Sequence, residues 1–411
     1  MFLYDTAAGA IRQFEPRDGR ATIYVCGITP YDAAHLGHVF TYLTFDVLTR
    51  RLRSLGVEVA AARNITDVDD DMLRIARERG GDYLDIGNRE VERFDTDLAA
   101  LHMLPVAAPR ATAFVDDIAR WVAQLQDAGF AYDVDGWVFF DVAKFPDYGN
   151  LSHYNRATML DLSRERGADP DDRRKRDSLD FVLWQRSATG EPSWDSRWGP
   201  GRPGWHIECS VMSSAELGTP IDIHGGGDDL IYPHHESEIA QSEALGAAPF
   251  VRQWMHVAMV KCHDQKMSKS LGNLVFARDL LEIVSGATIR LMLAAHHYRE
   301  SWNYDNREVA HAETRREAYA AAMQSTRLIA PDAAAELYEE FLERIDDDLD
   351  TAGALGVLDL VATAFSRSAA ADPSETVSAL GAMGPMLDML GALEVGEPAR
   401  QAVEAAAQLG C

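Results

Sequence analysis

Hydrophobic and polar residues follow two different periods in the first seventy positions of the chain. Residues 21–26, ATIYVC, form a short apolar run rich in β-forming side chains. A turn at 27–32 leads into residues 35–56, where apolar side chains recur at helical spacing until Gly56. Residues 57–66, VEVAAARNIT, predict a second strand. This order of strand, helix and strand predicts a βαβ unit of a parallel sheet, in which ligands bind at the strand ends.

The pattern then changes from helix to loop and back to strand. Residues 70–130 are mostly amphipathic helix, whereas residues 131–200 are richer in Asp, Arg, Gly and Pro, which predicts an insertion between two halves of the sheet. The second half runs from Trp205 to about Val260. It contains an apolar strand at IDIH, a glycine run at 225–227 and a helix that begins after a proline, Pro233.

From about Asp279 onward the pattern is almost wholly helical, with Ala-rich apolar stripes. We therefore expect an α/β catalytic domain over residues 1–278, with the insertion at 131–200, and an all-helical C-terminal domain over residues 279–411. The length of 411 residues is ample for two such units.

Charge narrows the range of partners. Lys and Arg number 39 against 65 Asp and Glu, so the net charge is −26. Residues 301–411 alone contain seven arginines, no lysine and 20 acidic residues, a net charge of −13. Such a surface repels phosphate polymers and anionic lipid. It argues against non-specific nucleic-acid binding by the protein and against RNA binding by residues 301–411.

The cysteines and the first residues indicate the compartment. Four cysteines, at positions 26, 209, 262 and 411, are too few and too scattered for a secreted disulfide framework. The first twenty residues lack the basic and apolar regions of a signal peptide, and the sequence contains no apolar run long enough to span a bilayer. We therefore expect a cytoplasmic protein that makes no membrane contact.

The first motif with chemical meaning is His35-Leu36-Gly37-His38, where the first predicted strand turns into a helix. The two imidazoles lie at i and i+3 on one face of the first turn, beside the backbone N–H groups that attract phosphate. Gly37 would allow a nucleotide to approach the backbone closely. Taken alone, the pattern is equally compatible with two surface histidines at a helix start.

The second motif is the loop 266–273, which begins Lys266-Met267-Ser268-Lys269-Ser270. Two lysines three residues apart can meet the negative charge that develops on a departing pyrophosphate. A solvated basic loop is the alternative, and the histidine motif more than two hundred residues earlier argues against it.

The third motif is a candidate metal site made of Cys26, Cys209, His234 and Glu238. His234 and Glu238 lie at i and i+4 on one helix face, and two sulfurs, an imidazole and a carboxylate suit zinc. Each cysteine alone would more often be a small buried hydrophobe. We expect His235 to point elsewhere and to pack, and we expect Cys262 and Cys411 to take no part.

The two nucleotide motifs resemble the HIGH and KMSKS signatures of class I aminoacyl-tRNA synthetases. Over about residues 20–305 the chain also resembles the cysteinyl-tRNA synthetase family, whose members use zinc to hold the thiolate of their substrate. The blocks that resemble the family are CGITPYDAAHLGH, NITDVDDD, GEPSWDS, GRPGWHIECS, IDIHGGGDDLIYPHHESEIAQSE and KMSKSLGN.

The resemblance implies a Rossmann-like HUP-type parallel sheet, one zinc ion per chain, and ATP with Mg²⁺ that converts L-cysteine to cysteinyl-adenylate. Soft thiolate binds zinc far better than a serine hydroxyl does, so cysteine would be selected without an editing domain. The implied catalytic residues are His35, His38, Lys266 and Lys269. The implied zinc ligands are Cys26, Cys209 and His234, with Glu238 as the fourth. The implied cysteine pocket contains Thr66, Trp205, His224 and Asp229, and the implied nucleotide site contains Gly27, Ile28, Thr29, Gly37, Thr41, Asn64, Gly227 and Val260.

The family has two branches, which pass cysteine to different acceptors. One branch loads tRNA; the other, the mycothiol cysteine ligases, joins cysteine to the amine of glucosaminyl-inositol and has no anticodon-binding domain. Ile28-Thr29-Pro30, the final His38, the segment 164–170 (RERGADP, in which Ala168 departs from the ligase form) and the short acidic C-terminal part are similar to the ligases. Glu238 and the sequences of the segments GRPGWHIECS and KMSKSLGN are more similar to the synthetases.

We favour the ligase branch, with L-cysteine, ATP and a small amine as substrates, and expect a monomer. A short cysteinyl-tRNA synthetase is the alternative. A third possibility, a non-catalytic binding or regulatory paralogue, is opposed by the intact histidine, lysine and zinc-ligand sets.

Overall fold

The computed structural model describes residues 1–31, 35–267, 271–367 and 377–394. Of the residues named above, Ser268, Lys269, Ser270 and Cys411 lie outside this range.

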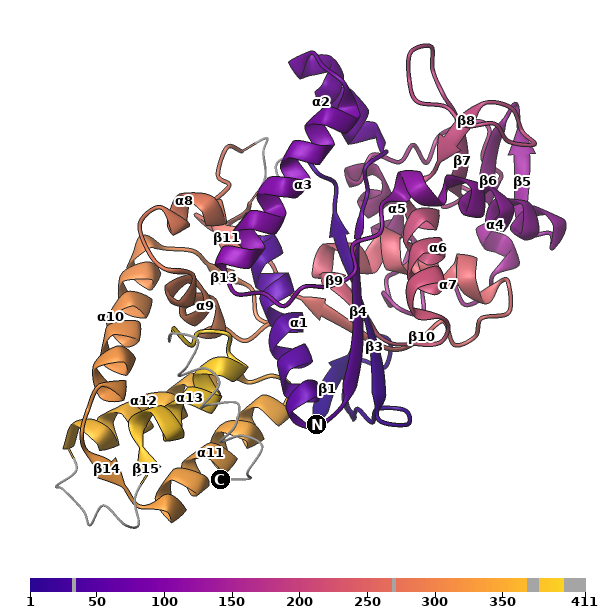
Figure 1. Cartoon of the computed structure of the whole chain (residues 1–411). Helices are drawn as coiled ribbons and strands as arrows, with labels where there is room; N and C mark the ends of the chain where they lie inside the picture. The colour runs from indigo at the N-terminus through magenta and orange to yellow at the C-terminus, as the bar shows by residue number, and fades with distance from the viewer. Residues whose placement is uncertain (32–34, 268–270, 368–376, 395–411) are drawn as a thin grey trace.

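A four-stranded parallel sheet forms the centre of the catalytic part (Figure 1). Its order is β10 (Val251–Val257), β9 (Ile221–Gly227), β3 (Arg20–Ile28) and β4 (Glu58–Ile65). The strand predicted at IDIH is longer than expected, because it includes the glycine run. A side chain at Gly225 would collide with the carbonyl of Met255 on β10, so glycine lets the two strands approach.

Helices cover both faces of this sheet. The helix α1 (Leu36–Ser54) packs on the face that carries Ile23 and Val25, and α6 (Trp205–Leu217) packs on the face that carries Tyr24 and Cys26. Successive side chains of a strand point to opposite faces, so β3 contributes to both layers. The predicted α/β fold with a Rossmann-like parallel sheet is confirmed.

The segment predicted as an insertion forms a second, antiparallel sheet on one side of the molecule (Figure 1). Its strands are β5 (Ala131–Val134), β6 (Trp137–Phe140), β7 (Phe181–Arg186) and β8 (Gly201–Pro203), and the helices α4 (Val115–Asp127) and α5 (Arg156–Glu165) accompany them. The helices α2 (Asp70–Arg79) and α3 (Tyr83–Ala100) connect β4 to this part. The short helices here are η1 (Ala111–Phe114) and η2 (Val142–Lys144).

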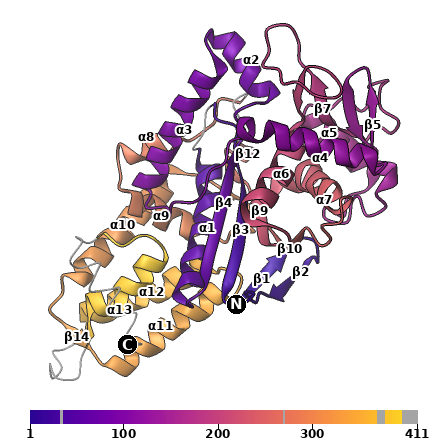
Figure 2. The ribbon, with the colours of Figure 1, turned by 45° about the vertical axis from the view of Figure 1, so that its right-hand side comes forward.

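Beyond β9 the chain turns through η3 (Asp228–Leu230) and η4 (Ile231–His235) into α7 (Glu236–Glu243). A small sheet of β11 (Val260–Cys262), β12 (Gln265–Lys266) and β13 (Trp302–Asn303) carries the start of the lysine loop. The hairpin β1 (Phe2–Asp5) and β2 (Ala10–Gln13) lies next to β10, as Figure 2 shows.

The C-terminal part is helical, as the sequence predicts. Its helices are α8 (Ala277–Leu281), α9 (Gly286–Ala294), α10 (Asn306–Met323), α11 (Pro331–Asp346), α12 (Thr351–Arg367) and α13 (Ala379–Met389), and the short strands β14 (Leu328–Ile329) and β15 (Val377–Ser378) pair with each other. These helices share a hydrophobic core with α1, and the buried Arg290 of α9 pairs with Asp46 of α1. Within the described residues, no helix combines the length and apolarity that a membrane span requires.

Candidate functional site

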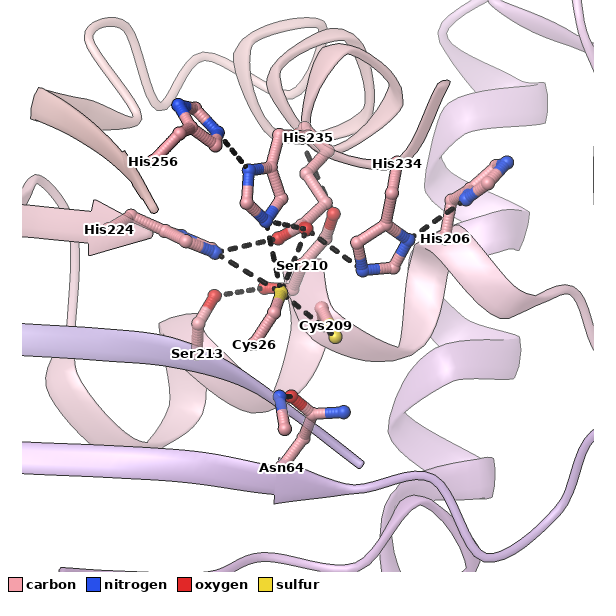
Figure 3. A network of polar contacts seen from close by, with 12 residues as sticks. Cys26, Asn64, His206, Cys209, Ser210, Ser213, His224, His234, His235 and His256 are labelled. Carbon is pink, nitrogen blue, oxygen red and sulfur yellow. Dashed lines mark hydrogen bonds and ion pairs between the residues drawn. The ribbon is translucent and has the colours of Figure 1, made fainter. Parts of the chain in front are cut away.

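Three segments that are distant in the sequence, β3, α6 and the consecutive η4 and α7, meet at the carboxyl end of β3 (Figure 3). Cys26 is near the end of β3, Cys209 lies on α6, His234 lies in η4 and Glu238 lies in the first turn of α7. All four side chains are buried, and their donor atoms lie within 4.8 Å of one another. The structure therefore brings together the complete set that the sequence suggests for a metal ion, and we call these four residues the donor cluster.

Individual distances within the donor cluster are compatible with a shared cation. The Cys26 Sγ atom lies 3.8 Å from the Cys209 Sγ atom and 3.6 Å from Glu238 Oε1. The His234 Nε2 atom lies 3.2 Å from Glu238 Oε1, as expected for residues at i and i+4 on a helix.

A second set of four overlaps the first. It replaces Cys209 and His234 by His224 of β9 and His235, and it keeps Cys26 and Glu238. The Cys26 Sγ atom lies 3.6 Å from His224 Nε2 and 3.2 Å from His235 Nε2. His224 thus joins the cluster directly, in addition to its predicted place in the cysteine pocket.

The expectation that His235 points away from the cluster is wrong. The non-helical residue of η4, Tyr232, precedes both histidines, and His235 itself has helical torsions (φ −66°, ψ −34°). His235 and Glu238 are separated by three positions, which places side chains on one helix face. The i, i+3 spacing of His235 and Glu238 was therefore the sequence signal that could have placed His235 in the cluster.

Burial determines the protonation of the cluster. It raises the pKa of the Cys26 and Cys209 thiols and of the Glu238 carboxyl, and it lowers the pKa of the His234 and His235 imidazoles. Burial thus favours the neutral form of each of these groups. The Glu238 Oε2 atom also receives no hydrogen bond among the described residues. Sulfur, imidazole and carboxylate donors with an unsatisfied carboxylate oxygen fit a divalent metal ion.

Other side chains hold the imidazoles in place. The Trp205 ring stacks on His234 with centroids 4.3 Å apart, and His206 Nδ1 lies 3.0 Å from His234 Nδ1. His256 Nε2 lies 2.7 Å from His235 Nδ1, and its other nitrogen lies 2.7 Å from the Thr6 hydroxyl. The sequence analysis missed His206, His256 and Thr6. The i, i+3 spacing of His206 and Cys209 on α6 could have indicated His206, whereas no motif spacing relates His256 or Thr6 to the cluster.

The predicted phosphate-binding end lies at the start of α1. His35 caps this helix by accepting a 3.1 Å hydrogen bond from the Gly37 N–H, and its ring stacks on His38 with centroids 3.8 Å apart. A Cβ on Gly37 would lie 2.9 Å from the His35 ring, so the capping arrangement itself requires glycine. The Thr41 hydroxyl donates to the Gly37 carbonyl and so faces the same turn.

The ends of β3 and β4 are joined by polar contacts. The Gly27 N–H donates a 2.6 Å hydrogen bond to Asn64 Oδ1, and Asn64 Nδ2 donates to the Thr66 hydroxyl. A side chain on Gly27 would overlap the Asn64 carbonyl. The Ile28 carbonyl accepts from the Thr66 N–H. The Thr29 hydroxyl, one residue beyond β3, donates to Asp69.

The first lysine of the loop 266–273 contacts the segment after β9. Its Nζ atom lies 3.3 Å from Asp229 Oδ2, and Arg166 Nη1 lies 3.4 Å from the same oxygen. The predicted Gly227 immediately precedes this turn, and Val260 begins β11, which pairs with the strand that carries Lys266. Arg166 and the insertion thus reach the candidate site, a connection that the sequence analysis did not make.

Comparisons with known proteins agree with this geometry. Residues 13–314 match the family model described as tRNA synthetases class I (C) catalytic domain. The chain is 46% identical over 377 residues to a Thermobifida fusca protein named L-cysteine:1D-myo-inositol 2-amino-2-deoxy-alpha-D-glucopyranoside ligase, a match that covers 90% of each chain. It is 44% identical over 375 residues to a cysteine--tRNA ligase of Trichlorobacter lovleyi, covering 87% of this chain and 76% of that ligase.

A solved structure of similar fold is the Mycobacterium tuberculosis methionyl-tRNA synthetase in complex with methionyl-adenylate. The TM-score is 0.63 at 16% sequence identity, and the alignment covers 95% of this chain and 87% of that chain. At this level of identity the likeness concerns the fold alone.

Proposed function

Because the chain belongs to the family of class I (C) tRNA synthetase catalytic domains, we propose that it is a ligase that activates L-cysteine with ATP and transfers the cysteinyl group to an amine, that of glucosaminyl-inositol. The observation that supports cysteine as the substrate is the donor cluster, because it places two buried sulfurs, an imidazole and a carboxylate at the ligand-binding edge of the sheet.

In this proposal one zinc ion is held by Cys26, Cys209 and His234, with Glu238 as the fourth ligand. Bound zinc supplies a soft Lewis acid that favours a thiolate over a hydroxyl. Trp205, stacked on His234, forms a rigid wall beside this point. Thr66, His224 and Asp229 complete the cysteine pocket.

The residues at the start of α1 and in the lysine loop take the phosphates. The cysteine carboxylate attacks the α-phosphorus of ATP, which enters with Mg²⁺, and the bond to pyrophosphate breaks. His35 and His38 stabilise the phosphates on one side, and Lys266 and Lys269 neutralise the leaving pyrophosphate on the other. Gly27 and Gly37 belong to the nucleotide site, where their missing side chains make room for the Asn64 carbonyl and the His35 ring. Ile28, Thr29, Thr41, Asn64, Gly227 and Val260 complete the nucleotide site.

In the second step the free amine of the acceptor attacks the carbonyl carbon of cysteinyl-adenylate. AMP leaves, an amide forms, and a nearby carboxylate or histidine takes the proton that the amine loses. Two observations support a small acceptor. The Thermobifida fusca relative named as a ligase of an amino sugar matches over 90% of its own length, and residues 301–411 carry a net charge of −13.

Transfer to tRNA is the second candidate, since the relative from Trichlorobacter lovleyi is 44% identical. That ligase extends further, because the match covers 76% of it, and a polyanionic acceptor is opposed by the acidic C-terminal part.

Cysteine-dependent exchange of labelled pyrophosphate into ATP tests the activation step. We expect exchange with zinc-loaded protein and L-cysteine, almost none with L-serine, and loss of exchange when the metal is stripped. Exchange no faster than in a blank without amino acid would contradict the proposal.

A further inference from the structure

A second cavity lies on the opposite face of the sheet from the donor cluster, between β3, β4, α1, α3 and residues 103–108. Its volume is about 270 Å³. This is close to the lower end of ligand pockets, about 300–1,000 Å³, so the cavity suits a small molecule. Most of its wall is apolar and includes Ile23, Val25, Phe45, Leu98, Met103 and Val106.

One cation interrupts this apolar wall. Arg63 of β4 lines the cavity and is only 6% exposed. Its Nη2 atom donates to the half-exposed Asp95, and its guanidinium lies 4.9 Å from the centre of the Phe94 ring. Its Nε and Nη1 atoms have no acceptor among the described residues. A buried guanidinium with unmet N–H groups is costly, because each such group has lost its hydrogen bonds to water.

Two carboxylates also line the wall: Asp95, which among the described residues accepts only from Arg63 Nη2, and Asp46, which does not contact Arg63. Asp46 pairs with Arg50 at 2.8 Å and with Arg290, so its charge is already shared between two cations. An anionic acceptor in the cavity would complete the contacts of Arg63 after a small rotation of the guanidinium, and its apolar part would fill the rest of the space.

We propose that this cavity is a second ligand site that binds a small carboxylic acid with a compact apolar body, with its carboxylate on Arg63. The site is linked to the donor cluster, because Tyr42 lines the cavity and its hydroxyl donates a 3.3 Å hydrogen bond to the Cys26 carbonyl.

The binding test uses zinc-loaded full-length protein and 4-fluorobenzoate, followed by ¹⁹F NMR titration. We expect saturable binding of 4-fluorobenzoate to the wild type. Binding of 4-fluorobenzamide to the wild type, and of 4-fluorobenzoate to the Arg63→Met variant, should be at least roughly tenfold weaker, because a charged hydrogen bond is lost. The matched pair is Ala99→Leu, which places a larger side chain on the cavity wall, and Ala100→Leu, whose neighbouring side chain does not line the cavity. Binding should be lost in the first and kept in the second.

Three results would overturn the site: no saturable binding at millimolar benzoate, equal affinity for the amide, or unchanged binding in Ala99→Leu. The leucine pair decides the matter if Arg63→Met does not fold. The NMR readout does not depend on the proposed catalytic function. The link through Tyr42 does depend on the proposed function. It predicts that 4-fluorobenzoate changes the KM for cysteine in Ala100→Leu and leaves this KM unchanged in Ala99→Leu. Equal KM values with and without the probe in Ala100→Leu would refute the link.

Discussion

The main-chain N–H of Leu36 donates a 2.8 Å hydrogen bond to the carbonyl oxygen of Val275. Leu36 lies between the two histidines at the start of α1, and Val275 follows the lysine loop, so the two nucleotide motifs share a main-chain contact across 239 positions of sequence. An isolated bridge between His35 and Phe276 extends this contact. The turn that we propose to bind phosphate and the exit of the lysine loop are therefore held in a fixed relation.

Lys266→Met tests the role of the lysine loop. We expect kcat/KM for pyrophosphate exchange to fall by roughly 10²-fold, because the preorganised positive charge that would face the departing pyrophosphate is lost. The KM for cysteine should change little. Lys261→Met is the matched control, since Lys261 is paired directly opposite Lys266 between β11 and β12. Equal losses in both variants would indicate a general effect on this small sheet.

Cys209→Ser tests the donor cluster. Loss of one sulfur should remove most of the zinc and nearly all cysteine activation, measured by elemental analysis and exchange, while the far-ultraviolet circular dichroism stays the same. Cys262→Ser should keep the zinc, because Cys262 is buried but lies outside both overlapping donor sets.

The histidines distinguish these two donor sets. If zinc uses Cys209 and His234, then His234→Ala loses the metal and His235→Ala retains most of it. The reverse order of zinc contents would assign the ion to the set that contains His224 and His235.

Arg290→Leu should destabilise the chain by about 3–5 kcal/mol, measured by urea unfolding, because Asp46 would keep a buried charge with fewer partners. Arg290 is fully buried and also donates to the carbonyl oxygens of Leu390 and Leu101. Arg307→Leu is the control, since Arg307 is 82% exposed and its replacement should leave the free energy of unfolding nearly unchanged. If Arg290→Leu also left the free energy of unfolding nearly unchanged, the proposed role of the Arg290–Asp46 pair in the shared core would be refuted.

Stability should depend on pH through Asp69, which caps α2 and accepts from Thr29. Burial raises the pKa of Asp69 to about 6. The folded state therefore holds a proton that the unfolded state has released, and stability falls as the pH rises from about 4 to about 6. Asp69→Asn keeps the cap and should remove this part of the pH dependence of unfolding. Asp82→Asn, at the exposed cap of α3, should retain it; identical pH profiles for wild type and Asp69→Asn would contradict the assignment.

The sequence predicted those parts of the fold and site that depend on local spacing. The first βαβ unit follows from residues 21–66, and the meeting of His234 with Glu238 follows from their i, i+4 spacing. The donor chemistry suggested that Cys26 and Cys209 join them, and the family resemblance implied the same set. Local spacing cannot show this, because 183 positions separate the two cysteines.

Contacts that depend on tertiary packing could not be predicted. His256 approaches His235 from β10, and Arg166 reaches Asp229 because α5 of the insertion packs on η4. The pairing of Asp46 with Arg290 joins residues 244 positions apart, and neither has a motif around it.

The acceptor of the cysteinyl group is the central claim, and one competition experiment tests it most directly. Zinc-loaded protein receives L-cysteine and ATP together with glucosaminyl-inositol and cysteine tRNA, and AMP release is followed with the mass of the product. We predict AMP release that depends on the amino sugar, with a product whose mass is that of the amide. Efficient charging of the tRNA with no amide formed would contradict the account of the acceptor.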